Sequence, residues 1–320
     1  MNHDEQRKSH EWQSEEPAAH AERRPGQATG HLTRPFERVL IATDLSEGAD
    51  LAIARAGWLP LADSAEVHLV HVLAPDERAQ AERRARESLD KAAQTLAELR
   101  YRSGGSPLVV RRDVLRGDAF GSISLAILED GSDLVVVGRH GRRGIMGHFL
   151  GSTAEQLVRK VGLPVLVAHV RPEGPYRKPL FATAFEAGAD RVLTALFRVT
   201  GSGADRIEMM HAVEEIPGDG LLVAGASPAE EQRYYEEQFS HAARAASALA
   251  RGAGSAGEKL ELVVRIGSAA SVVIDEASGR ETDLIAVGTR ARAGLPRLLL
   301  GTTAGTVLRE APCDVLIVPL

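Results

Sequence analysis

The chain has 320 residues, 44% of them hydrophobic, which suffices for two ordinary domains with substantial cores. Its net charge of −6 gives no reason to expect nucleic acid or an anionic membrane as a partner. The single cysteine, Cys313, excludes an intramolecular disulfide and a cysteine metal cluster, and it fits a reducing compartment. No apolar run approaches the ~18 residues of a spanning helix, and the N-terminal stretch lacks the apolar core of a signal peptide. We therefore expect a soluble, cytoplasmic protein.

The N-terminal segment differs in composition from the rest of the chain. Residues 1–35 are polar and charge-mixed with almost no aliphatic side chains, so nothing there offsets the entropy cost of ordering, and a disordered tail is predicted. A second break is the Pro- and Gly-containing stretch 171–178, which is typical of a linker. These breaks divide the chain into a tail, a first domain over 36–170, a linker and a second domain over 179–320.

Within the first domain, short apolar runs alternate with helical patterns. The predicted strands are 38–43, 67–72, 108–115, 133–137 and 164–169. Helices are predicted around 47–58, 77–100, 118–128 and 152–161. This alternation predicts an α/β fold with a parallel sheet and helices on both faces. If the strand order is 3-2-1-4-5, a ligand is expected outside the carboxyl ends of the first and fourth strands, where the order reverses.

A glycine-rich loop follows the fourth strand in the sequence DLVVVGRHGRRGIMGHFLGST (133–153). Gly138, Gly141 and Gly151 precede a helix that starts at Ser152. Glycines let a backbone approach an anion closely, and the N–H groups at a helix start point at it, so the segment suits a phosphate. It is neither a P-loop nor the dinucleotide fingerprint, because it lacks Gly-Lys-Ser/Thr and the G-x-G-x-x-G spacing. An ordinary Gly-rich strand-to-helix turn is the alternative reading.

The same pattern recurs about 150 residues later as DLIAVGTRARAGLPRLLLGTTAGTVL. The second repeat has predicted strands at 179–184, 205–213, 259–265, 283–287 and 314–318. Its predicted helices lie near 186–199, 228–252, 267–279 and 301–310. Two positions depart from the first repeat: Ala184 replaces Asp44, and Ala291 replaces Gly141.

These residues resemble the universal stress protein (UspA) family in its tandem-domain form. The resemblance rests on IATDLS at the first strand, VHV at the second, Asp133, the G-x2-G-x9-G-[S/T] loop and the closing PVLV strand. It implies two tandem Rossmann-like (adenine nucleotide alpha hydrolase-like) domains. Each would hold a five-stranded parallel sheet of order 3-2-1-4-5. It also implies ATP as the bound cofactor, with Mg²⁺ as a candidate companion ion.

Carried over by position, the resemblance assigns seven residues to the nucleotide. Asp44 and Val72 fall at the adenosine end, and the ribose and phosphates are assigned to Gly138, Gly141, Gly151, Ser152 and Thr153. Positive charge beside the phosphates is expected from Arg139, Arg142 and Arg143. Ser46 is interpreted as a helix cap. Because Ala184 cannot accept a hydrogen bond and Ala291 adds a methyl group to the loop, weak nucleotide binding or none is expected in the second repeat.

The function predicted is that of a nucleotide-dependent stress-response regulator or switch, with the second domain as a packing partner. No nucleophile–base set, phosphate-binding lysine or acidic metal pair is recognisable, so no enzyme activity beyond slow ATP hydrolysis and no protein metal site are expected. A receiver-like phospho-switch is disfavoured because Asp44 has no acidic partner. The main alternative is a stress-response scaffold that binds no nucleotide and acts through protein–protein interaction.

The closing strands of the two repeats, 165–167 and 315–318, are apolar and would form exposed sheet edges. Proteins cover such edges, and in the resembled family they mediate dimerisation. The two repeats are therefore expected to pair as an internal pseudo-dimer. A further homodimer and an unidentified regulatory protein are the other expected partners.

Overall fold

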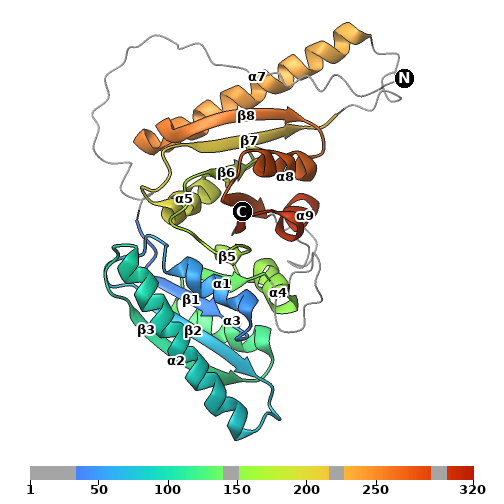
Figure 1. Cartoon of the computed structure of the whole chain (residues 1–320). Helices are drawn as coiled ribbons and strands as arrows, with labels where there is room; N and C mark the ends of the chain where they lie inside the picture. Colours follow the sequence, from blue (N-terminus) through green and yellow to red (C-terminus); the bar gives the residue numbers. More distant parts are fainter. Residues whose placement is uncertain (1–33, 140–150, 216–226, 290–300) are drawn as a thin grey trace, which may run out of the picture.

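A computed structural model of the chain describes residues 34–139, 151–215, 227–289 and 301–320 (Figure 1). The predicted tail lies outside the described residues except for its last two positions. Gly141, Arg142 and Arg143 of the glycine loop, and Ala291 of the second repeat, also lie outside them. Among the described residues, no helix has both the length and the apolar composition needed to cross a membrane.

The first domain holds five parallel strands in the order β3-β2-β1-β4-β5. They are β1 (Arg38–Ala42), β2 (Glu66–Leu73), β3 (Val109–Arg116), β4 (Leu134–Gly138) and β5 (Val165–Ala168). The helices are α1 (Glu47–Ala56), α2 (Ala79–Arg102), α3 (Ala119–Asp130) and α4 (Ser152–Lys160). The predicted order 3-2-1-4-5 is confirmed, and it places the order reversal between β1 and β4, whose ends meet where Ala42 pairs with Val137.

The second domain repeats this arrangement in the order β8-β7-β6-β9-β10. Its strands are β6 (Pro179–Ala182), β7 (Ile207–Val213), β8 (Leu260–Ile266), β9 (Leu284–Thr289) and β10 (Asp314–Pro319). Its described helices are α5 (Ala189–Thr200), α7 (Pro228–Gly252), the 3-10 helix η1 (Gly254–Lys259), α8 (Ala269–Gly279) and α9 (Thr302–Glu310). The two repeats therefore share one topology.

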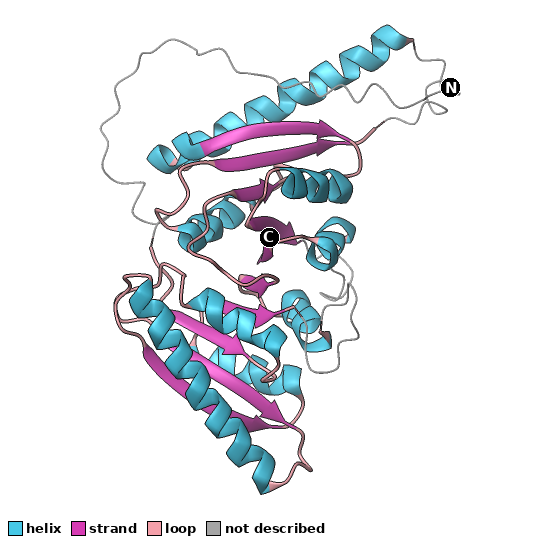
Figure 2. Cartoon of the chain, in the orientation of Figure 1, coloured by secondary structure: helices cyan, strands magenta, loops and turns pink. Residues whose placement is uncertain are grey.

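The two closing strands join the domains into a single ten-stranded sheet. Strand β5 pairs antiparallel with β10, with Leu166 opposite Leu316 and Val167 opposite Val315. Figure 2 shows the strands of both domains following one another through the molecule, with helices on either side. The predicted internal pairing of the repeats is confirmed, and it covers both apolar edges.

Alternate residues of each strand enter two separate cores, one on each face of the sheet. Val39 and Ile41 pack on the face covered by α1, α2, α5 and α7, whereas Leu40 and Ala42 pack on the face covered by α3, α4, α8 and α9. Because both of their faces are buried, the central strands β4, β5 and β6 are apolar runs without polar alternation, whereas the outer strand β3 includes Arg111, Arg112 and Asp113.

The aspartate that precedes the fourth strand has a structural role in both repeats. Asp133 accepts hydrogen bonds from the backbone N–H groups of Glu37 and Arg38, and Asp283 does the same for Arg177 and Lys178. These bonds fasten the start of the first strand of each domain to its fourth. Asp133 also forms a 2.5 Å ion pair with Arg198 of α5 in the second domain. It therefore contributes to the contact between the domains.

Candidate functional site

The turn after β1 carries the predicted carboxylate. Asp44 Oδ1 accepts hydrogen bonds from the backbone N–H of Ser46 at 3.1 Å and from its hydroxyl at 2.6 Å. Ser46 Oγ in turn accepts from Ala49 N at 3.2 Å and caps α1, which confirms its interpretation as a helix cap. Leu45, between Asp44 and Ser46, adopts a φ angle of 61°, a left-handed conformation that is strained for a branched aliphatic side chain. Such strain persists where surrounding contacts impose it, often at ligand sites.

A histidine that sequence reasoning missed fixes the end of β2 against the end of β1. His71 is buried, and its Nδ1 lies 2.8 Å from the carbonyl oxygen of Thr43. A carbonyl only accepts, so Nδ1 carries the proton and donates. Its neighbour Val72, assigned to the adenosine end, is half-buried beside this pair and packs on the core under α3 and α4. The recurrence of the histidine as His211 in the second repeat was an available signal.

Gly138 is required by helix packing. A Cβ on this residue would lie 2.2 Å from the carbonyl oxygen of Gly48 and 2.9 Å from the Cα of Ala49. The first turn of α1 therefore occupies the space beside the end of β4. The resemblance placed Gly138 at the ribose and phosphates, but its lack of a side chain is explained by this close approach alone.

The backbone N–H groups in the first turn of α4 can bind an anion. Gly151 is the N-cap residue and supplies no side-chain acceptor to the helix, and the N–H groups of a first helical turn have no intrahelical partner. Gly151 N itself donates to Arg139 O at 3.1 Å, which holds the helix start beside the end of β4. Ser152 and Thr153 then present two hydroxyl groups on this first turn. This geometry suits a phosphate.

Arg139 does not lie where the sequence suggested. Its guanidinium donates to the carbonyl oxygen of Arg309 near the end of α9 in the second domain. Burial there lowers the pKa of Arg139. The Arg139 side chain, which was expected to add positive charge beside the phosphates, is thus engaged in the contact between the domains.

The second domain forms the same corner, meaning the turn after its first strand together with the end of its second strand, but without the aspartate. Phe185 takes φ 54° where Leu45 stands in the first domain, and the Nδ1 of His211 donates to Thr183 O at 2.9 Å. Gly288 matches Gly138, but here a Cβ would meet the side chain of Leu320 at 2.8 Å instead of helix backbone. At this strand end the side chain of Leu320 lies nearest to the added Cβ, where helix backbone lies nearest in the first domain.

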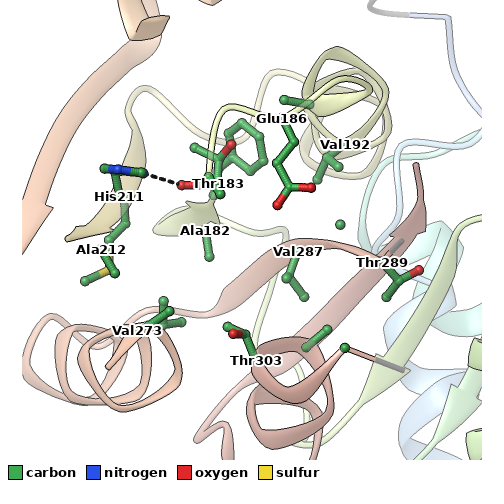
Figure 3. Close-up of a pocket in the computed structure, with 18 of the residues that line it drawn as sticks. Ala182, Thr183, Glu186, Val192, His211, Ala212, Val273, Val287, Thr289 and Thr303 are labelled. Atoms are coloured by element: carbon green, nitrogen blue, oxygen red, sulfur yellow. Dashed lines mark hydrogen bonds between the residues drawn. The ribbon is translucent and has the colours of Figure 1, made fainter. Parts of the chain in front are cut away.

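A cavity of about 460 Å³ opens at this corner of the second domain (Figure 3). It lies at the carboxyl ends of β6, β7 and β9 and at the starts of α5, α8 and α9. Ala182 and Val287 contribute apolar surface, Thr303 a hydroxyl group, and Glu186 a carboxylate that points into the space above Val287. The second domain thus has a pocket at this corner, although its sequence motif is degenerate.

Comparison with known proteins identifies the family. The model of the Universal stress protein family matches residues 35–169 and again residues 175–319. The chain belongs to the universal stress protein family. Its tandem form, predicted from the repeat, is thereby confirmed.

Individual relatives agree with this assignment. Universal stress protein A homolog 2 of Coxiella burnetii is 31% identical over 145 residues, which cover 45% of this chain and 94% of that protein. A universal stress protein of Mycolicibacterium smegmatis is 24% identical over 301 residues, covering 88% of this chain and 96% of its own length. The crystal structure of a universal stress protein from Archaeoglobus fulgidus superimposes with a TM-score of 0.60 at 20% identity, over 88% of this chain and 98% of that one. The last likeness establishes the fold.

The candidate site of the first domain thus consists of two parts that the sheet places side by side. Asp44 stands on the turn after β1, and Ser152 and Thr153 open the helix that follows the neighbouring strand β4. Gly141 lies outside the described residues. Within the described ranges, no group of three or more His, Cys, Asp or Glu side chains is placed to hold a metal ion.

Proposed function

We propose that this universal stress protein binds ATP in its first domain and acts as a nucleotide-dependent regulator. The observation that carries the proposal is the pairing of a carboxylate on a strained turn with an uncapped helix start, across the β1/β4 order reversal. Adenosine offers hydroxyl and amino donors to Asp44, and the phosphates are anions suited to the first turn of α4.

The proposed role requires that the first domain bind ATP, and it involves no catalytic group. Asp44 is already engaged by the backbone and hydroxyl of Ser46, which does not suit a general base. Turnover of ATP is therefore expected to be slow at most, and a nucleotide that stays bound can act as a signal. Mg²⁺ would accompany the phosphates through ATP and water, since it usually keeps several waters.

Titration calorimetry of the full chain with ATP, with and without Mg²⁺, tests this function. One site per chain is expected. Asp44→Asn should weaken binding about tenfold or more, since about 1.4 kcal/mol corresponds to a factor of ten. Asp190→Asn makes the same charge change at an exposed position of the second domain and should leave ATP binding as it is. ATP binding that survives Asp44→Asn unchanged would remove Asp44 from the proposed site.

A scaffold acting through protein–protein contacts is the second candidate. Gly138 and Asp44 both have roles in packing and capping that need no ligand, and this observation favours it. Complete absence of ATP binding in the calorimeter, by a chain whose circular dichroism spectrum and melting are normal, would select the scaffold.

A further inference from the structure

A buried histidine of the first domain lies between two carboxylates. The Nδ1 atom of His68, on β2, lies 2.5 Å from Asp130 Oδ2 at the end of α3. Its Nε2 atom lies 2.9 Å from Asp113 Oδ2 on the neighbouring strand β3. An ionised carboxylate only accepts hydrogen bonds, so both contacts are bonds at the same time only when both ring nitrogens carry a proton. The arrangement therefore suits the imidazolium form of His68.

An arginine balances the charge of this cluster. Arg111 of β3 donates to Asp113 Oδ2 at 2.8 Å and to Asp130 Oδ1 at 2.7 Å, so each carboxylate also faces a guanidinium. With His68 protonated, two carboxylates face two cations. With His68 neutral, one ring nitrogen presents a lone pair to a carboxylate, and a contact that attracts becomes one that repels. The stability of the cluster thus depends on one proton.

The cluster fastens the end of α3 to the sheet. Asp130 is the last residue of α3, and Arg38 of β1 donates to its carbonyl oxygen at 3.3 Å. Glu66 pairs in register with Arg38 and lies on the same face of β2 as His68, two residues before it. From α3 the chain continues to Asp133, which bonds the start of β1 and forms an ion pair with the second domain. The fastened turn is therefore next to a contact between the domains.

The second repeat places fixed charges at the equivalent positions. Glu208 of β7 stands where His68 stands in the first domain, and Arg280 follows α8 where Asp130 ends α3. Arg280 Nη1 donates to Glu208 Oε1 at 2.7 Å. A glutamate–arginine pair does not change its charge near neutral pH, whereas a histidine can. The two domains therefore differ at this place in their response to protons.

We propose that His68 is a proton-operated clasp for the end of α3. Its imidazolium form joins Asp130 of α3 to Asp113 of β3, and the loss of one ring proton loosens the last turn of the helix. Because deprotonation accompanies a rise in pH, the first domain weakens at this end as the pH rises through the titration of His68. The equivalent end of α8 does not respond. The clasp does not depend on ATP binding.

Two matched backbone N–H groups report on the clasp and on its control. Ser132 N donates to Ile127 O just after α3, and Thr282 N donates to Ala277 O at the equivalent place after α8. Hydrogen exchange of the full chain, expressed as protection factors, is followed from about pH 5 to 9, and the NMR resonances of the His68 ring measure its protonation in the same samples. Protection of Ser132 should fall about tenfold or more as the ring loses its proton, while that of Thr282 stays constant.

Variants separate the histidine from other effects of pH. His68→Gln offers one donor and one acceptor at every pH, so its Ser132 protection should be low and independent of pH. His241→Gln removes an exposed histidine of α7 and should leave the response of Ser132 intact. Thermal melting establishes that each variant is folded.

Four results would overturn the proposal. They are a ring whose protonation does not change over this range, a constant protection of Ser132 while the ring titrates, an equal fall at Thr282, and a pH response that survives in His68→Gln. Each of them is independent of whether the first domain binds ATP, which Asp44→Asn tests separately.

Discussion

A buried ion pair at the junction of the two domains allows a sharp test of how they are held together. Asp314, at the start of β10, is fully buried, and Arg55 of α1 is 3% exposed. Arg55 Nε donates to Asp314 Oδ2 at 2.7 Å, and Tyr176 of the linker donates its hydroxyl to the same oxygen at 2.7 Å. The other oxygen accepts from the backbone N–H groups of His169 at 2.8 Å and Val170 at 3.2 Å. One carboxylate thus joins both domains and the linker.

Asp314→Asn keeps the shape of this side chain and removes its charge. The Arg55 guanidinium would remain buried without a compensating anion, and the new amide nitrogen cannot accept the bonds from Arg55 and Tyr176. Removal of one partner of a buried pair costs about 3–5 kcal/mol, so the free energy of unfolding should fall by that amount. Urea denaturation followed by circular dichroism measures it.

An exposed ion pair of the same length serves as the control. Lys178 Nζ lies 2.7 Å from Glu281 Oε2, with the two side chains 56% and 84% exposed. Glu281→Gln should therefore change the unfolding free energy by about 1 kcal/mol or less. Arg55→Met combined with Asp314→Asn should recover part of the loss, because no charge is then left buried. A loss below about 1 kcal/mol in Asp314→Asn, or strictly additive effects in the double variant, would refute the reasoning.

Three further predictions concern packing, pH and the first-domain corner. Gly138→Ala should destabilise the chain by about 1–3 kcal/mol or more in urea denaturation, because its Cβ would lie 2.2 Å from the carbonyl oxygen of Gly48. The control Gly162→Ala, with no atom within 4 Å of the added Cβ, should cost less than about 1 kcal/mol; equal costs would contradict the argument. Burial, with Asp314 nearby, raises the pKa of Tyr176 well above its usual value, so the folded chain keeps this proton where the unfolded chain loses it. The free energy of unfolding should therefore fall as pH rises above about 10, and Tyr176→Phe should flatten that slope; an unchanged slope would refute this. His71→Phe should lower thermal stability, because it deletes the buried bond to Thr43 O, and an unchanged melting temperature would show that the bond contributes nothing.

The sequence predicted the architecture because its signals are local and repeated. Short β-branched runs alternate with amphipathic helices, and the same alternation occurs twice, so a parallel sheet in each repeat follows from general rules. The strand order 3-2-1-4-5 and the pairing of 165–167 with 315–318 needed the family resemblance as well, together with the rule that apolar sheet edges are covered. Most boundaries differ from the predicted ones by one or two residues, as is usual where helix and strand ends depend on tertiary contacts.

What the sequence did not reveal depends on contacts between distant segments. Arg55 and Asp314 are 259 residues apart, and nothing local marks either as a partner of the other. The reason for Gly138 is the approach of a helix turn that precedes it by about 90 residues. Glu186, which follows Phe185 with its φ of 54°, lines a cavity formed with residues of β7, β9 and α9 that lie far away in the sequence. Residue-by-residue comparison of the repeats records that Ala184 has lost a carboxylate, and it cannot show that a neighbouring side chain supplies another.

Helix α1 links the candidate ATP site to the domain junction. Ser46, bonded to Asp44, caps its start, and Arg55 in its last turn reaches Asp314 of the second domain. Ten residues of α-helix span about 15 Å and behave as one rigid element, so a ligand that alters the turn at Asp44 acts on the same body that carries Arg55. In the second domain the matching position is Ala195, whose side chain can form no ion pair. The Arg55–Asp314 connection between a strand-end turn and the sheet edge of the other domain is therefore made by α1 and is not repeated at the matching position of α5.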